Sequence, residues 1–173
     1  PADLYDLNHS NSYTWGMNWS LSEGDKILSA TLFFDNLNNN AEPEATDYLY
    51  IHLLDNPSLG TRQLREVNPA ADDFAGQGVY LTSFSDNNWY LNSYNRVVNP
   101  AEDFTYEFNA DQLAALVEYS SNNGVFGFGF DPDCHFVNDG VKFTINTAVP
   151  EPATMSLLGI GVLGLLGLKR RKA

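Results

Sequence analysis

The feature that most constrains the fold is the strict alternation of phenylalanine with glycine in VFGFGF, residues 125–130. A period of two places all three phenylalanines on one face of a β-strand, whereas a helix would spread them around its circumference. The segment 140–147 (GVKFTINT) alternates in the same way, and we predict that it pairs with 125–130. The glycines between the aromatic residues indicate a bend or the close approach of another backbone.

Other segments also have strand character, because they alternate or are rich in β-branched and aromatic residues. They are 26–37, 47–56, 79–84, 103–108 and, more weakly, 89–98. A single helix is predicted after Asn109, which forms a capping-box pattern with Gln112, and Gly124 ends the segment. Short strands, polar turns and one short helix predict an all-β fold, an antiparallel β-sandwich of jelly-roll type spanning residues 1–148.

The charge is strongly unbalanced: 22 Asp and Glu stand against nine Lys and Arg, and the formal net charge is −13. Aromatic residues make up 13% of the chain, which is more than a disordered acidic segment would carry. The acidic residues therefore belong to a folded surface. Such a surface repels nucleic acid, so we expect no nucleic-acid partner, and it is compatible with divalent cations.

The chain changes character after residue 148. Pro150, Glu151 and Pro152 lie in 149–152, residues 153–168 carry no charge, and four basic residues follow: Lys169, Arg170, Arg171 and Lys172. Sixteen helical residues span about 24 Å, slightly less than a typical hydrocarbon core. We predict a transmembrane helix at 153–168, with the basic tail 169–173 held in the cytoplasm and the body on the opposite side.

These three elements in this order resemble the PEP-CTERM sorting signal of Gram-negative, exopolysaccharide-producing bacteria. The resemblance implies export by the general secretory route with a signal peptide, and retention as an inner-membrane intermediate. It also implies recognition by an exosortase, a membrane-embedded cysteine protease that would cut near Pro150, Glu151 and Pro152. The body would then reach the cell surface or the extracellular matrix, with this chain as the substrate of the protease.

The body itself is similar to one group of PEP-CTERM proteins. The segments that carry this similarity are LYIHLLDN (49–56) and GFGFDPDCHFVNDGVKFTI (127–145). The resemblance implies a β-sandwich and no assigned reaction, so it supports the architecture and leaves the biochemical role open.

The densest polar segment is DPDCHFVNDG, residues 131–140. Calcium prefers six to eight oxygen ligands, and four side chains of this segment offer oxygens: Asp131, Asp133, Asn138 and Asp139. The spacing differs from that of an EF-hand. The alternative is a structural one, in which these residues cap turns of a long hairpin. We therefore consider both a Ca²⁺ site and a hydrogen-bonded turn.

Aromatic residues offer a second kind of candidate site, because their apolar faces can stack on sugar rings. The residues that we single out are Trp15, Trp19, Trp89 and Tyr90. For each of them the alternative is packing in the core.

No nucleophile-elbow, phosphate-binding or dinucleotide-binding motif occurs in the sequence, and no pair of carboxylates is singled out by a motif. We therefore expect a non-enzymatic surface or matrix protein associated with the exopolysaccharide of a biofilm. Three alternatives remain open: a calcium-dependent carbohydrate-binding module, a secreted hydrolase with two carboxylates in a cleft, and a subunit of a self-assembling extracellular fibre.

Overall fold

The computed structural model describes residues 4–40, 47–66, 71–86, 88–122 and 124–149. These residues form twelve strands and one helix, in the following order. They are β1 (Asp6–Leu7), β2 (Asn11–Asn18), β3 (Lys26–Asn39), β4 (Leu49–Asp55), β5 (Gly60–Arg65), β6 (Val79–Phe84), β7 (Tyr90–Leu91), β8 (Val97–Val98), β9 (Glu102–Glu107), α1 (Ala110–Ser121), β10 (Val125–Pro132), β11 (Phe136–Val137) and β12 (Gly140–Ala148).

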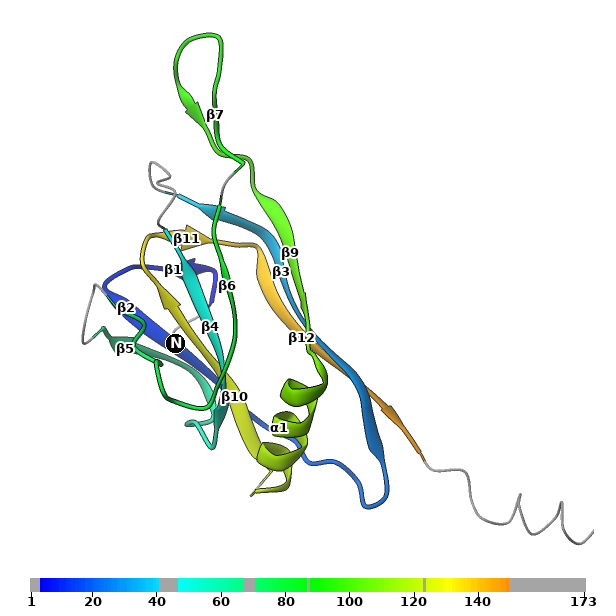
Figure 1. Ribbon diagram of the computed structural model, residues 1–173. Coiled ribbons are helices and arrows are strands. Elements are labelled where there is room, and N and C mark those ends of the chain that lie inside the picture. Colours follow the sequence, from blue (N-terminus) through cyan, green and yellow to red (C-terminus); the bar gives the residue numbers. More distant parts are fainter. Residues whose placement is uncertain (1–3, 41–46, 67–70, 87, 123, 150–173) are drawn as a thin grey trace, which may run out of the picture.

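The strands form two five-stranded antiparallel sheets and one two-stranded hairpin (Figure 1). One sheet has the order β5-β2-β10-β4-β6. In the other, the order is β1-β11-β3-β12, and β9 also pairs with β3. The prediction of an all-β fold with one short helix is thus confirmed, while the assignment to the jelly-roll type stays a prediction.

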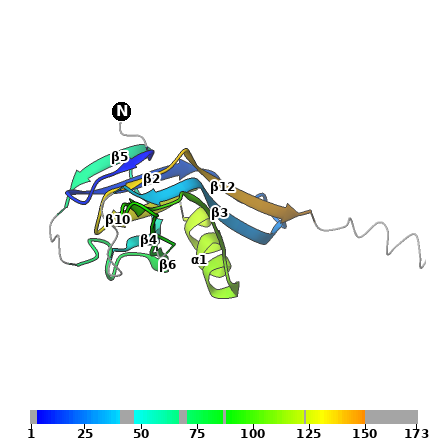
Figure 2. The ribbon, with the colours of Figure 1, turned by 90° about the horizontal axis from the view of Figure 1, so that it is seen from above.

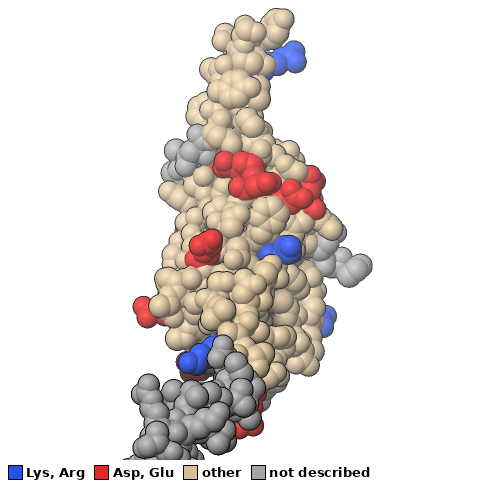
Figure 3. Space-filling model, turned by 90° about the vertical axis from the view of Figure 1, so that its right-hand side faces the viewer, with Lys and Arg blue, Asp and Glu red and all other residues tan. Residues whose placement is uncertain are grey.

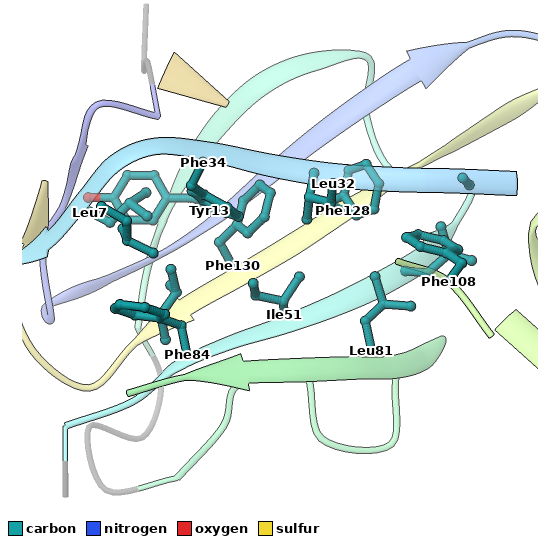
Figure 4. Packing of buried hydrophobic residues seen from close by; sticks show 14 of the residues in the cluster. Leu7, Tyr13, Leu32, Phe34, Ile51, Leu81, Phe84, Phe108, Phe128 and Phe130 are labelled. Carbon is teal, nitrogen blue, oxygen red and sulfur yellow. The ribbon is translucent and has the colours of Figure 1, made fainter. Parts of the chain in front are cut away.

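The core lies between the two sheets and is built largely from phenylalanines. Phe126, Phe128 and Phe130 of β10 are at most 1% exposed, as the alternation predicts. Phe34 of β3 meets Phe130 edge to face, with 5.6 Å between ring centroids, and Phe143 of β12 meets Phe128 at 4.8 Å. Figure 4 shows β3 side chains pointing toward those of β10 across this layer.

The predicted pairing of 140–147 with 125–130 is wrong. β12 pairs with β3, with Lys142 opposite Phe33, whereas β10 lies between β2 and β4 in the other sheet. Their apolar faces meet across the core instead, as the contact between Phe128 and Phe143 shows. Alternation reports which face of a strand is buried, and it carries no information about which strand lies beside it.

Helix α1 begins at the predicted cap. The Asn109 side chain accepts a hydrogen bond from the Gln112 backbone N–H at 3.0 Å, and the Gln112 side chain accepts one from the Asn109 N–H at 3.0 Å. The helix contacts β3, β4, β6 and β10 (Figure 2). Its Leu116 is fully buried. Because α1 touches strands of both sheets, it closes one side of the core.

The sorting and membrane elements lie outside the described residues: Pro150, Glu151 and Pro152, the predicted span 153–168, and Lys169 to Lys172. Within the described part of the chain, no helix has the length and apolar character needed to cross a bilayer. The last strand, β12, ends at Ala148. In Figure 1 this end of β12 and the β7–β8 hairpin lie at opposite ends of the molecule.

The two glycines of β10 face away from the core and are closely covered. A Cβ atom on Gly127 would overlap the carbonyl oxygen of Trp15, which is backbone of the neighbouring strand. A Cβ atom on Gly129 would lie 2.8 Å from the ring of Phe74, a side chain that is itself only 4% exposed. Other backbone or side chains therefore cover both positions closely.

We predict that Gly127→Ala destabilises the protein more than Gly129→Ala. The first variant forces an overlap with backbone and costs about 1–3 kcal/mol, whereas the Phe74 ring can shift to accommodate the second. Urea denaturation of the two variants beside the parent chain measures the difference. Equal losses of unfolding free energy in the two variants would contradict the close backbone approach at Gly127.

Candidate functional site

Five acidic residues that influence one another lie around Asp131 on the outer face of β10, and we call them the carboxylate cluster: Glu66, Asp72, Asp73, Asp131 and Asp133. Asp131 follows Gly127 and Gly129 on this face and is 1% exposed. The segment that contains Asp72 and Asp73 covers it, and the Asp73 backbone N–H donates to Asp131 Oδ2 at 2.6 Å. A carboxyl group of a β-strand is thereby enclosed among other acids.

The electrostatics of the cluster disfavour negative charge. Burial raises the pKa of Asp131 to about 7, against a lowering by the Asp73 N–H, and the charges of Asp73, Glu66 and Asp72 raise it further. Burial also raises the pKa of Glu66, and Asp73 and Asp133 act in the same direction. Asp131 Oδ1 and Glu66 Oε2 are buried without a hydrogen-bond partner among the described residues.

A histidine holds the covering segment in place. His52 of β4 is 3% exposed, and its Nε2 lies 2.7 Å from Asp72 Oδ2. Its Nδ1 lies 3.2 Å from the backbone carbonyl oxygen of Gln77. Since both ring nitrogens are engaged, His52 fixes this segment to the sheet.

Asp133 lies at the edge of the cluster beside Tyr50. Its backbone N–H donates to the Tyr48 carbonyl oxygen at 2.8 Å. Burial raises the pKa of Asp133, and the hydrogen bond to Tyr50 lowers it. Burial, followed by the charge of Asp133, raises the pKa of Tyr50 to about 12, so the phenol stays protonated and donates.

The four proposed calcium ligands have different surroundings. Asp131 and Asp133 belong to the carboxylate cluster. Asn138 instead donates to the Leu4 carbonyl oxygen and accepts from the Gly140 N–H at 3.0 Å, and Asp139 accepts from the Asn36 amide at 2.8 Å. In the described ranges, no group of three or more His, Cys, Asp or Glu side chains has the arrangement of a metal site. The calcium site stays a prediction.

Glu66, Asp72 and Asp73 were not singled out from the sequence, although they influence the pKa of Asp131. They lie some sixty residues before Asp131, and they approach it only because their segment packs over β10. The neighbouring Cys134 is half-buried, and burial raises the pKa of its thiol, which disfavours a nucleophilic thiolate.

The four singled-out aromatic residues fall into two pairs. Trp15 and Trp19 pack against Phe128 and Phe126, with centroid distances of 6.0 and 6.1 Å, so core packing describes both. Trp89 and Tyr90 are 42% and 53% exposed. Tyr90 belongs to the β7–β8 hairpin, which projects from the body in Figure 1.

Beside this hairpin lies a hollow of about 560 Å³ that we call the asparagine groove. Its lining consists of Asn38, Asn39, Asn40, Asn95, Arg96, Val97 and Asn99. The first three residues belong to the end of β3 and the residue after it, and the others belong to the hairpin and the segment that follows. Asn95, Arg96 and Val97 belong to the segment 89–98, which the sequence indicates only as a weak strand, and no sequence pattern singled out the groove.

We predict that Asp131→Asn raises the thermal midpoint at pH 8 and changes it little at pH 4. The folded state keeps a proton on Asp131 that the unfolded chain releases between pH 3.8 and about 7. The free energy of unfolding of the parent protein therefore falls as the pH rises through this window. The amide removes that loss. Thermal unfolding of the full chain in the presence of chelator measures it, and Glu23→Gln in an exposed turn is the control. An equal effect at both pH values would contradict the burial of the charge.

Comparison with known proteins gives one match. Residues 148–172 match the family model of the PEP-CTERM protein-sorting motif. No curated protein and no solved structure is significantly similar to the chain. The match begins at the last residue of β12 and contains Pro150, Glu151 and Pro152, the apolar run and the basic cluster. The chain is thus a PEP-CTERM protein, by the sorting motif that it carries at residues 148–172.

Proposed function

We propose that this protein is an exported, non-enzymatic component of the cell surface or extracellular matrix, processed by an exosortase and associated with exopolysaccharide. The observation that carries the proposal is the position of the sorting motif. The motif match begins at Ala148, where β12 ends, so all described strands precede the Pro-Glu-Pro triplet. Cleavage at the triplet would leave both sheets intact.

The physical character of the tail supports the membrane intermediate. Residues 153–168 are uncharged, and the basic residues 169–172 favour the cytoplasmic side. The body would then face the other side, where the exosortase acts on Pro150, Glu151 and Pro152. The triplet suits this role because proline disfavours a helical conformation for the residue before it, and a protease would bind an extended segment.

The burial of Asp131 and His52 supports a non-enzymatic role. A general acid or base must come within hydrogen-bond reach of its substrate. Asp131 is 1% exposed and His52 is 3% exposed, and the segment around Asp72 covers both. The shifted pKa of Asp131 therefore belongs to a packed interior.

A calcium-dependent carbohydrate-binding module is the second candidate. The observation that favours it is the pair of buried, unpartnered oxygens, Glu66 Oε2 and Asp131 Oδ1, among like charges. A divalent cation would offset this repulsion, and Ca²⁺ takes oxygen ligands of this kind.

We predict that the Pro150→Ala/Pro152→Ala variant remains unprocessed and cell-associated in a host that contains an exosortase. The double substitution removes both prolines of the sorting motif and leaves the apolar run and the basic cluster unchanged. Immunoblots of membrane and released fractions measure processing, with Pro100→Ala in the body as the control. Normal release of the double variant would contradict handling by an exosortase.

The calcium alternative predicts that Ca²⁺ raises the thermal midpoint of the full chain relative to chelator. The rise should grow with calcium concentration, because binding to the folded state alone stabilises it by mass action. Asp131→Asn should abolish the rise, and Glu23→Gln should preserve it. A thermal midpoint that is the same in calcium and in chelator would contradict calcium binding.

A further inference from the structure

We propose that the asparagine groove, together with the tip of the β7–β8 hairpin, binds a segment of uncharged polysaccharide. The inference rests on the proposed association with exopolysaccharide, and it adds the binding site and the chemical class of the ligand. Three properties of the described residues carry it: a pre-formed hairpin, a fixed polar framework, and side chains that are left free to bind.

The hairpin is held in shape by its own turn. Asn92 Oδ1 accepts from the backbone N–H groups of Tyr94 and Arg96 at 2.9 and 3.1 Å, and the Asn92 N–H donates to the Arg96 carbonyl oxygen at 2.9 Å. Asn95 has a positive φ of 53°, which asparagine tolerates better than most residues. The tip is therefore ordered before any ligand arrives, which reduces the entropy lost on binding.

The base of the hairpin is tied to the end of β3. The Asn38 amide donates to the Asn99 carbonyl oxygen at 2.6 Å, and the Asn99 amide donates to the Asn39 carbonyl oxygen at 2.8 Å. Asn39 is 1% exposed, and its backbone N–H donates to Asp86 Oδ2 at 3.0 Å. These contacts hold the end of β3 and the segment after the hairpin, which form the two walls of the groove, in a fixed position relative to each other.

Three other residues of the lining are exposed and have side chains without a partner among the described residues. They are Asn40, Asn95 and Arg96. An amide presents two N–H donors and a carbonyl acceptor, and a sugar hydroxyl both donates and accepts. Asn38, Asn39 and Asn99 thus form a fixed framework. The side chains of Asn40, Asn95 and Arg96 can instead form hydrogen bonds with the hydroxyl groups of a sugar.

The apolar part of the site also suits a sugar chain. Tyr94 at the tip is 83% exposed, and Val97 adds an apolar patch to the lining. An aromatic ring with a polar edge packs against an apolar surface while its hydroxyl stays hydrated. The volume of about 560 Å³ lies within the range of ligand sites in proteins.

Charge decides which polysaccharide fits. The described lining of the groove contains no carboxylate, and Arg96 is its one charged residue. The face in Figure 3 carries red acidic patches below the hairpin, beside a few blue ones, and only five Lys and Arg in the sequence lie outside 169–172. An anionic polymer would be repelled by this body, whereas an uncharged one would not.

The same tip is a poor match for lipid. Tyr94 is flanked by Ser93 and Asn95, and Arg96 follows. Inserting the tip into acyl chains would bury these polar groups without partners, which is unfavourable. The groove is thus better suited to a hydrated, hydroxyl-rich ligand.

The test uses the full chain, purified in a mild detergent, in native gels that contain dextran, hydroxyethyl cellulose or galactomannan, with alginate as the anionic comparison. We expect at least one uncharged polymer to retard the protein, and alginate not to. Tyr94→Ala and Asn40→Ala should each weaken the apparent affinity about fivefold or more. Asn95→Gly should do the same, since glycine keeps the positive φ and removes the amide.

Two matched variants separate binding from folding. Tyr94→Phe keeps the ring and should retain binding, and Asn146→Ala removes an exposed asparagine from β12, outside the groove, and should have no effect. The inference is overturned if none of the three uncharged polymers retards the chain, if alginate alone does, or if the groove variants bind like wild type. It is also overturned if Tyr94→Ala reduces flotation of the full chain with phosphatidylglycerol vesicles while polymer binding is unchanged.

The outcome is independent of the export proposal. Retardation in gels is measured on purified protein, whereas processing of the Pro150→Ala/Pro152→Ala variant is measured in cells. Normal processing without polymer binding overturns only the groove, and binding without processing overturns only the exosortase route.

Discussion

The packing of Phe126, Phe128 and Phe130 between the two sheets is the interaction on which the rest of the structure depends. These rings meet Phe34 of β3 and Phe143 of β12 at centroid distances between 4.8 and 6.0 Å. β10 pairs on both sides and is thus the central strand of its sheet, and its inner face carries these three phenylalanines. On its outer face, Gly127 and Gly129 leave room for the backbone of Trp15 and the ring of Phe74 to pack closely against the strand.

The carboxylate cluster follows from this arrangement. The segment that brings Phe74 over Gly129 also places Asp72 and Asp73 beside Asp131, where burial raises the pKa of the Asp131 carboxyl group to about 7. The hairpin and the asparagine groove do not depend on this cluster. The contacts that fix them are hydrogen bonds from side-chain amides to backbone carbonyl oxygens. The residues proposed to bind the polysaccharide, Asn40, Asn95 and Arg96, lie outside the strands of the two five-stranded sheets.

Local patterns predicted what depends on neighbouring residues. The period of two identified the buried face of β10 and the partly buried, core-facing side of β12, and Asn109 with Gln112 identified the start of α1. The pairing of β12 with β3, and the approach of Glu66 to Asp131, depend on distant parts of the chain and leave no local trace. The segment 89–98 reads as a weak strand because Asn92 and Asn95 turn the chain in its middle, leaving two strands of two residues. The sorting motif, in contrast, is entirely local and is recognised from composition and order.

The placement of the hairpin and of the end of β12 at opposite poles of the molecule gives the body a direction. Any attachment made beyond Ala148, transient or lasting, holds the body by its proximal pole. The groove then lies distal to the point of attachment, at the greatest reach that this domain provides. A polymer that approaches this pole would first meet the β7–β8 hairpin, whose turn carries the exposed Tyr94.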